Sequence, residues 1–406
     1  MEELSGIRIS EELTHPRPLQ IIYNQQNGTI EGVSYMSDYK FISSDSHVME
    51  PKNLWLDWID PKYKDRAPYI KREGDFDQWY ADGDVKFGVV GSNTQAGLRF
   101  ENPEDIRVEG NYEEVRKGGY DPHEHVKDMD ADSVYAGVIY PSMGLTTWVI
   151  PSSDLLTAVF KAYNNWLADF CKPYPKRLRG LGMLNIDSGE DGVKELYRIK
   201  DIGLAGAMIP QRPVFGRYDH PMYEPLWNSA EECEMPLAIH IGTSRWIPGG
   251  VTPFGTDKGL VEHVNQEYHM KDNLVALLYS DVFVRHPDLR IGVAEYEISW
   301  APYLFNRMDR IYNERPTKFN FRHPDGRLPS DYFKSNMFLS FQEDDLGIQL
   351  RDYVGINTLM WGSEYPHAES TFPKSREIVD RILDGVPEEE KILIAGENCA
   401  KMFGIA

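Results

Sequence analysis

The chain has 406 residues, and its 43 Lys and Arg residues against 64 Asp and Glu residues give a formal net charge of −21 at pH 7. A field of that sign repels nucleic acid and anionic membrane surfaces, so neither is expected as a partner. A chain this long buries most of its apolar surface on folding and needs neither disulfides nor a structural metal. Any metal that it binds is therefore expected to serve chemistry.

Targeting signals and cysteine spacing bear on the location of the protein and on the kinds of metal site that it can form. The N-terminus MEELSGIRISEELTHPRPLQ has no basic start followed by an apolar run, and no stretch approaches the roughly 20 apolar residues of a membrane helix. The three cysteines Cys171, Cys233 and Cys399 lie far apart and form no CxxC pair, which excludes a cysteine-rich zinc site. We expect a cytoplasmic protein.

Residues 1–38 are polar and contain turn signals such as Asn27-Gly28. We interpret them as an N-terminal extension that contacts another subunit, with a partly ordered tail as the alternative. Residues 39–406 are expected to form one metal-dependent barrel domain. The protein is expected to be a homo- or hetero-oligomer that acts on a small molecule.

From residue 40 onward, short apolar runs alternate with longer segments of helical period, which is typical of βα units around a parallel sheet. The expected strands are 40–47, 133–141, 177–185, 204–210, 236–242, 289–297, 337–342 and 357–366. Helices are expected between them at 155–171, 192–203, 222–234, 302–314 and 374–385. This order predicts an α/β fold, a distorted (β/α)8 TIM barrel.

Two segments interrupt the alternation of strands and helices. Residues 50–130 follow the first strand and are rich in Asp, Gly, Tyr and Pro, so we expect an insertion with a small β subdomain or lid. Residues 243–275 lengthen the connection after the fifth strand. Both follow the carboxyl end of a strand, where barrel enzymes carry their active sites.

Residue types that bind metals stand at this same end of four strands. Asp45 and His47 are two apart in the first strand and point to the same side. His240 ends the fifth strand, Glu295 the sixth and Glu364 the eighth. Nitrogen and oxygen donors of this kind suit zinc, iron or manganese, and buried charges are costly unless paired or metal-bound. We predict that these residues hold one or two divalent ions, with Asp45, His240 and Glu364 also catalytic.

Four further residues are candidates for the site. His263 lies after the fifth strand and is a candidate ligand of a second ion, with a solvated or capping histidine as the alternative. Arg212 follows the fourth strand and is expected to pair with a substrate carboxylate, with a surface salt bridge as the alternative. His367 is expected to bind substrate or to orient a ligand. Trp246 is expected to line the substrate pocket, with ordinary packing as the alternative.

The sequence resembles the amidohydrolase-related family, in the aminocarboxymuconate-semialdehyde-decarboxylase-like branch of the amidohydrolase superfamily. The matching stretches are SSDSHVMEP (43–51), PLAIHIG (236–242), RHPDLRIGVAEYEISWAPYLFNRMD (285–309), LMWGSEYPHAESTFPKS (359–375) and ENCAKMFG (397–404). The resemblance implies a distorted barrel that binds a divalent metal at its strand ends, with His47, His240 and Glu364 as ligands.

Two positions depart from the pattern of the family. Its eighth-strand ligand is usually Asp, and the longer Glu364 side chain displaces the carboxylate by roughly 1 Å, enough to cost about 100-fold in rate. Decarboxylase-like members often place a histidine near the end of strand six, where this chain has Glu295. Additional carboxylates favour iron or manganese over zinc.

The resemblance implies cleavage of C–N, C–O or C–C bonds, or decarboxylation without oxygen. Our first expectation is a hydrolase, in which a metal-activated water attacks a small amide, ester or thioester and Glu364 or Asp45 handles the proton. The first alternative is a dinuclear iron- or manganese-type oxygenase that needs a redox partner. The others are a non-oxidative decarboxylase and a non-catalytic subunit that keeps the barrel.

Overall fold

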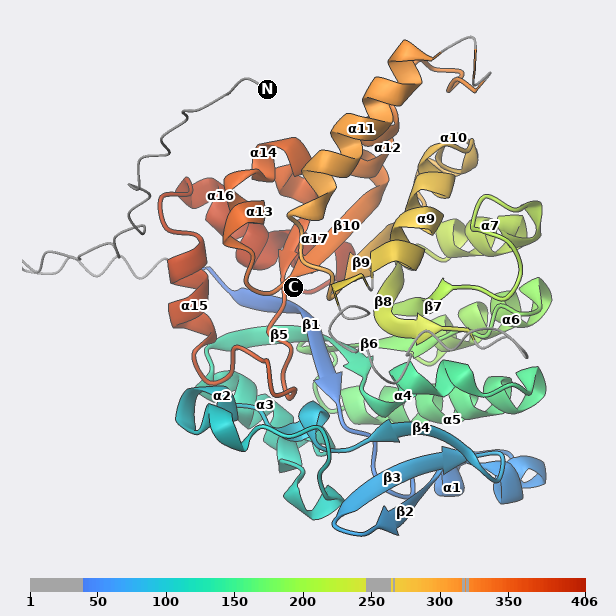
Figure 1. The fold of residues 1–406 in the computed structure, drawn as a ribbon, viewed down its shortest axis with the longest axis vertical. Coiled ribbons are helices and arrows are strands. Elements are labelled where there is room, and N and C mark those ends of the chain that lie inside the picture. Colours follow the sequence, from blue (N-terminus) through green and yellow to red (C-terminus); the bar gives the residue numbers. More distant parts are fainter. Residues whose placement is uncertain (1–38, 246–263, 266, 316–317, 319–320) are drawn as a thin grey trace, which may run out of the picture. The chain divides into compact units, whose positions relative to one another are not determined.

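Eight parallel strands form the central sheet of the structure, a computed structural model that describes residues 39–245, 264–265, 267–315, 318 and 321–406 (Figure 1). The strands are β1 (Phe41–Val48), β5 (Val134–Pro141), β6 (Leu178–Met183), β7 (Gly206–Arg212), β8 (Leu237–Ser244), β9 (Ile291–Ala294), β10 (Met337–Phe341) and β11 (Leu359–Trp361). Neighbours in this order are hydrogen-bonded and parallel. All eight predicted strands are present, and the predicted barrel fold is confirmed.

The sheet nearly closes into a barrel where the chain after β11 meets β1. The backbone N–H groups of Ser363 and Glu364 both donate to the Asp45 carbonyl oxygen, at 3.1 and 2.9 Å. The Ser44 hydroxyl donates to the Trp361 carbonyl oxygen at 3.0 Å. These contacts replace a regular ladder of hydrogen bonds between β1 and β11. We call this junction the seam, and the barrel is distorted there. The same contacts also tie two candidate ligands, Asp45 and Glu364, together through the backbone.

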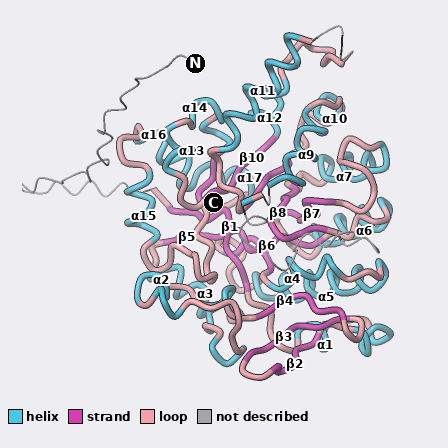
Figure 2. Tube along the Cα trace, in the orientation of Figure 1, coloured by secondary structure: helices cyan, strands magenta, loops and turns pink. Residues whose placement is uncertain are grey.

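Helices cover the outside of the strands, as the alternation in the sequence predicts (Figure 2). The longer ones are α5 (Ser153–Cys171), α6 (Gly189–Asp201), α7 (Glu224–Glu232), α9 (Glu267–Leu278), α11 (Trp300–Glu314), α12 (Pro329–Asn336) and α15 (Ser375–Ile382). The shorter ones are α4 (Met143–Thr146), α10 (Val282–Arg285), α13 (Asp345–Gln349), α14 (Arg351–Val354), α16 (Glu388–Ile392) and α17 (Asn398–Phe403). The five helices named from the sequence are among them.

Helix α5 shows how the sequence specifies these elements. The Ser152 hydroxyl accepts a hydrogen bond from the Leu155 N–H group and caps the helix. Leu155, Val159 and Phe160 then recur at helical spacing and are at most 1% exposed. Such a stripe packs one helix face against the barrel and leaves the other face to solvent.

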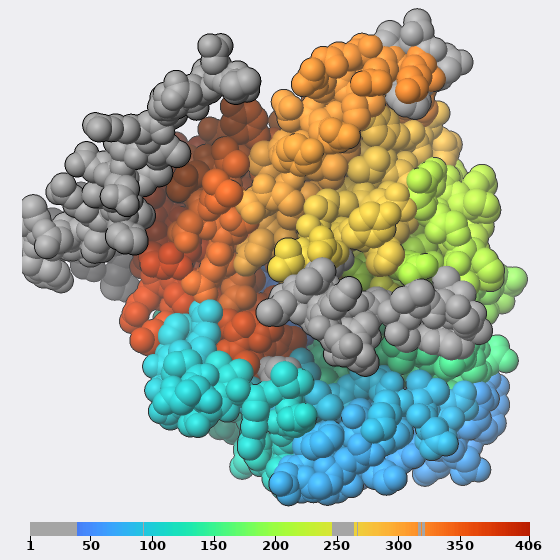
Figure 3. All heavy atoms as spheres, in the orientation of Figure 1, coloured from blue at the N-terminus to red at the C-terminus, as the bar shows by residue number. Residues whose placement is uncertain are grey.

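The segment after β1 contains the expected small β subdomain. Strands β2 (Tyr69–Glu73), β3 (Phe76–Ala81) and β4 (Val85–Val89) form an antiparallel sheet, accompanied by α1 (Leu54–Trp58), α2 (Leu98–Glu101) and α3 (Pro122–Ala131). The rings of Trp55 and Trp79 are fully buried and pack edge to face, 5.1 Å between centroids. Arg99 forms an ion pair with Glu343, which follows β10. The subdomain therefore packs against the barrel, and the two share one continuous surface (Figure 3).

Two regions named from the sequence lie partly or wholly outside the described residues. They are the predicted extension, residues 1–38, and residues 246–263 of the connection after the fifth strand. Among the helices that the structure describes, none has both the length and the apolar character required to cross a membrane.

Gly362 allows the close approach of the chain at the seam. A Cβ atom there would lie 2.7 Å from the Asp45 Cβ atom and 2.9 Å from the Ser340 hydroxyl oxygen. We predict that Gly362→Ala lowers the free energy of unfolding by about 1–3 kcal/mol, the usual cost of overpacking a core. Urea unfolding of the two proteins measures this difference. An unchanged urea midpoint would show that the seam accommodates the added methyl group without loss of stability.

Candidate metal centre

The carboxyl ends of β1, β8, β9 and β11 bring all five primary candidate residues together. The His47 Nε2 atom lies 3.3 Å from Asp45 Oδ1 and 3.2 Å from Glu364 Oε2. The His240 Nε2 atom lies 3.5 Å from Asp45 Oδ1 and 3.3 Å from Glu295 Oε2. These side chains therefore form one cluster at the barrel mouth. Their roles as metal ligands and catalytic groups stay predictions.

Five buried atoms of this cluster have no hydrogen-bond partner in the described part of the chain. They are both carboxylate oxygens of Asp45, Nε2 of His47, Nε2 of His240 and Oε2 of Glu364. An unpartnered buried polar atom costs about 1–3 kcal/mol, so their convergence needs a reason. One donor atom from each of Asp45, His47 and His240 lies within 4.8 Å of the others, a spacing that suits a shared cation. The residues present therefore fit a divalent metal ion.

Hydrogen bonds on the far side of two rings determine which nitrogen faces the cluster. His47 Nδ1 lies 2.8 Å from the Pro141 carbonyl oxygen, and His240 Nδ1 lies 3.0 Å from the Ile241 carbonyl oxygen. A carbonyl oxygen only accepts, so Nδ1 carries a proton in each ring, and Nε2 presents a lone pair when the ring is neutral. Metal-binding histidines are oriented in the same way.

The negative charges of the carboxylates strongly favour a positive charge beside them. Burial alone would lower the pKa of His47, but its contacts with Asp45 and Glu364 outweigh burial and raise that pKa well above its ordinary value. Burial raises the pKa of Glu295, and the negative charge of Glu364 raises it further. A proton and a divalent cation each offset this negative charge, so they compete for the cluster.

Three carboxylate residues at the barrel mouth have a left-handed backbone. The φ angles are 63° at Glu295, 51° at Glu297 and 60° at Glu364. A residue other than glycine rarely adopts this conformation, which costs of order 1–3 kcal/mol. Backbone strain of this kind clusters at functional sites, where it directs a side chain that the fold would otherwise aim elsewhere. We interpret the turns at Glu295 and Glu364 as the means by which β9 and β11 direct carboxylates toward the cluster. The Glu297 carboxylate instead accepts hydrogen bonds from the N–H groups of Gln342 and Glu343.

His367 lies directly beside the cluster. Its ring stacks on the His47 ring, with centroids 4.0 Å apart and an interplanar angle of 27°. Its Nε2 atom lies 2.9 Å from the Ser142 hydroxyl oxygen, and its Nδ1 atom lies 3.5 Å from Glu364 Oε2. The side chain is thus held between β5 and the chain after β11. Its expected contact with substrate stays a prediction.

The remaining candidates are less closely tied to the cluster. Arg212 ends β7, at the same end of the barrel, and is half-buried. Burial lowers the pKa of His269, and the nearby Arg212 charge lowers it further. The expected pairing of Arg212 with a substrate carboxylate stays a prediction. Trp246 and His263 lie outside the described residues, and so their roles stay predictions too.

Three residues beside the cluster were not identified from the sequence. Tyr140 and Ser142 lie at the end of β5, and the Tyr140 ring is 4.9 Å from the His240 ring between centroids. Glu369 Oε1 lies 4.0 Å from His367 Nδ1. The position of Tyr140 and Ser142 at a strand carboxyl end is a signal that could have indicated them. Glu369 lies in a loop, for which hydrophobic periodicity carries no signal.

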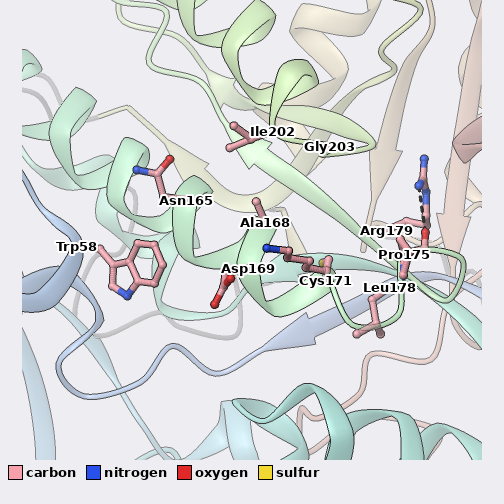
Figure 4. Close-up of a pocket in the computed structure, with 11 residues that line it drawn as sticks. Trp58, Asn165, Ala168, Asp169, Cys171, Pro175, Leu178, Arg179, Ile202 and Gly203 are labelled. Carbon is pink, nitrogen blue, oxygen red and sulfur yellow. Dashed lines mark hydrogen bonds between the residues drawn. The ribbon is translucent and has the colours of Figure 1, made fainter.

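A separate cavity of about 590 Å³ lies away from this cluster (Figure 4). It is lined by Trp58 of α1, by Asp169 and Cys171 of α5, and by Arg179 and Ile202. Arg179 belongs to the amino-terminal part of β6, whereas the cluster lies at strand carboxyl ends. None of the candidate ligands lines this cavity, so it is not the site of the cluster.

Residues 149–405 match the model of the amidohydrolase family, and the chain therefore belongs to that family. One curated relative is the 2-amino-3-carboxymuconate-6-semialdehyde decarboxylase of Dictyostelium discoideum, 23% identical over 310 residues, 72% of this chain and 79% of that protein. Another is the gamma-resorcylate decarboxylase of Rhodococcus jostii, 23% identical over 288 residues, 63% of this chain and 79% of that protein. The predicted family and its decarboxylase-like branch are thus confirmed.

Solved structures share the fold at low sequence identity. An amidohydrolase from Mycobacterium avium subsp. paratuberculosis aligns with a TM-score of 0.71 and 19% identity, over 90% of this chain and 100% of that one. A 5-carboxyvanillate decarboxylase from Novosphingobium aromaticivorans, complexed with manganese and 4-hydroxy-3-methoxy-5-nitrobenzoic acid, has a TM-score of 0.63 and 17% identity over 90% and 96%. These alignments support the barrel fold.

The expectation of a hydrolase is wrong. Both curated relatives are decarboxylases by name, and so is the Novosphingobium structure that was solved with an aromatic acid. The physical reason for the error is that the same metal and carboxylate cluster polarises a substrate oxygen in either reaction. The ligand types at the strand ends therefore indicate metal chemistry without distinguishing hydrolysis from decarboxylation.

We predict that protein purified without chelators holds about one divalent ion per chain, as expected of a site with three protein ligands, and that His240→Ala loses it. Elemental analysis of both proteins measures this. His286→Ala is the matched control, because His286 is also buried but lies before β9, beside Glu224 and Glu231 at 3.0 Å each. Equal metal content in the His240 and His286 variants would contradict the site.

Proposed function

We propose that this protein is a metal-dependent, non-oxidative decarboxylase of a small aromatic carboxylate. The observation that carries the proposal is the convergence of unpartnered buried donor atoms from Asp45, His47 and His240 beside Glu364. The two decarboxylases among the curated relatives support the reaction class. Manganese in the Novosphingobium decarboxylase supports Mn²⁺ as the ion.

Decarboxylation needs no oxidant and no redox partner. The bond between the ring carbon and the carboxylate carbon breaks, CO₂ leaves, and the ring carbon gains a proton in its place. A divalent cation held by Asp45, His47 and His240 would supply Lewis-acid polarisation of a substrate oxygen. The side chains around it must then hold the substrate and deliver the proton.

Glu295 is the group best placed to deliver that proton. Its side chain is 25% exposed, whereas those of Asp45 and Glu364 are at most 3% exposed. Burial and the neighbouring Glu364 charge raise the pKa of Glu295, which favours the protonated form that a proton donor needs. We therefore assign proton delivery to Glu295, and this role takes precedence over the alternative of a metal ligand.

The other residues of the mouth supply binding and orientation. Glu364 contacts both His47 and His367, so it orients the two stacked rings and adds negative charge beside the proposed cation. His367 is the candidate for a hydrogen bond to a ring hydroxyl of the substrate. Arg212 is the candidate for a second acidic group, since a guanidinium pairs well with a carboxylate. Trp246 is the candidate for packing against the ring.

The test of the reaction is CO₂ release under nitrogen from 2,6-dihydroxybenzoate, 5-carboxyvanillate and related hydroxylated aromatic acids. We expect release from at least one acid, with Mn²⁺ restoring the activity of chelator-treated protein. In D₂O, one deuterium should replace the carboxylate on the ring, because the proton comes from the protein and solvent. Turnover that requires O₂ would contradict the proposal and favour the oxygenase.

Two isosteric variants separate proton delivery from metal binding. We predict that Glu295→Gln keeps wild-type metal content but lowers kcat by about 100-fold or more, the usual contribution of a positioned acid. Glu364→Gln should instead lower metal affinity, because it removes the charge next to His47 and His367. Titration with Mn²⁺ and single-turnover CO₂ release measure the two effects. Loss of metal from Glu295→Gln would return Glu295 to the ligand set.

A further inference from the structure

A short segment at the end of β5, residues 141–144, contacts the imidazole rings of His47 and His367. The Pro141 carbonyl oxygen lies 2.8 Å from Nδ1 of His47, and the Ser142 hydroxyl oxygen lies 2.9 Å from Nε2 of His367. These contacts are on the side of each ring that faces away from Glu364 Oε2. The position of residues 141–144 therefore sets the orientation of both rings.

Glu50 holds this segment in place. Its Oε2 atom accepts a hydrogen bond from the Met143 N–H group at 2.9 Å, and its Oε1 atom accepts one from the Gly144 N–H group at 2.7 Å. Strand β1 and the chain after it thus reach the end of β5 at two points, through His47 in β1 and, three residues later, through Glu50. The structure places Glu50 against the segment that orients the histidines.

The contact is too specific to be ordinary packing. Glu50 is fully buried, and burial raises its pKa to about 7 despite the backbone N–H groups that favour its ionised form. A Cβ atom at Gly144 would lie 2.6 Å from the Pro141 Cβ atom and 3.0 Å from Glu50 Oε1, so the contact requires glycine there. An apolar side chain at position 50 would avoid the cost of burying a carboxylate. A function that needs the two acceptor oxygens explains why the carboxylate is present.

We propose that Glu50 is a positioning residue of the metal centre, which anchors residues 141–144 and thereby orients His47 and His367. The inference rests on the proposed metal centre. It concerns a residue that acts through its neighbours, because both carboxylate oxygens of Glu50 are bonded to backbone N–H groups of α4. The Tyr112 hydroxyl also donates to the Glu50 carbonyl oxygen at 2.8 Å, so the β subdomain supports the same anchor.

The first test is the affinity for Mn²⁺ of Glu50→Gln, measured by electron paramagnetic resonance of the free ion. A glutamine has one acceptor oxygen, so either Met143 or Gly144 loses its hydrogen bond. We expect the affinity to fall by about 10- to 100-fold, as for other groups that support metal ligands. Glu50→Asp keeps two acceptor oxygens and should lose less.

The matched control is Asp132→Asn. Asp132 is also a buried carboxylate, 4% exposed, and it accepts from the Ser375 N–H group at 2.9 Å and from the Ser375 hydroxyl. It supports α15 and has no contact with residues 141–144 among its hydrogen bonds. We expect this variant to lose a similar amount of thermal stability while its Mn²⁺ affinity stays at the wild-type value.

The second test uses metal-free protein with ¹⁵N-labelled histidine. We expect Glu50→Gln to change the ring ¹⁵N shifts of His47 and His367, because their partners at Pro141 and Ser142 move. Asp132→Asn should leave them unchanged. Variants of His47 and His367 assign the signals. This readout decides the role of Glu50 even if the wild-type protein binds no metal.

The outcomes separate this inference from the proposed reaction. Wild-type Mn²⁺ affinity together with unchanged His47 and His367 signals in Glu50→Gln would overturn the positioning role. Equal losses of affinity in Glu50→Gln and Asp132→Asn would overturn it as well, because the loss would then follow from stability alone. A wild-type protein that binds Mn²⁺ but releases no CO₂ would contradict the decarboxylase and leave the Glu50 result intact.

Discussion

Carboxylates converge at one end of the barrel, and their mutual repulsion must be offset for this end of the structure to be stable. Asp45, Glu295 and Glu364 lie within contact distance of two imidazole rings, and several of their oxygens have no hydrogen bond in the described part of the chain. Such an arrangement is stable only if positive charge enters it. The raised pKa of His47 and the fit to a divalent cation are two consequences of this one constraint.

The barrel supports this concentration of charge through backbone contacts. The seam between β1 and the chain after β11 joins Asp45 to Glu364, and the carbonyl groups of Pro141 and Ile241 orient two rings. Left-handed turns at Glu295 and Glu364 direct their side chains inward at a cost in strain. The supporting network extends from β1 to β5 and into the β subdomain, so the site is a property of the whole end of the barrel.

The same cluster explains why residue types at the strand ends do not distinguish hydrolysis from decarboxylation. A cation beside carboxylates lowers the energy of negative charge on a substrate oxygen, whether water attacks the substrate or CO₂ leaves it. The two reactions differ in what lies opposite the substrate. Hydrolysis needs a bound water as nucleophile, whereas decarboxylation needs a proton donor aimed at the ring carbon. Glu295, partly exposed at the mouth, suits the second requirement.

The sequence by itself determined the eight barrel strands, five of the helices and the strand-end positions of the candidate ligands, because hydrophobic period and residue type are local properties. Those candidates are Asp45, His47, His240, Glu295 and Glu364. Parallel strands then bring their carboxyl ends together, so the cluster could be predicted as well. Only the tertiary structure decided the partners of Ser142, Glu369 and Glu50, since contacts such as Glu50 with Gly144 join residues 94 positions apart. Neither periodicity nor composition records which distant backbone N–H group a buried carboxylate will meet.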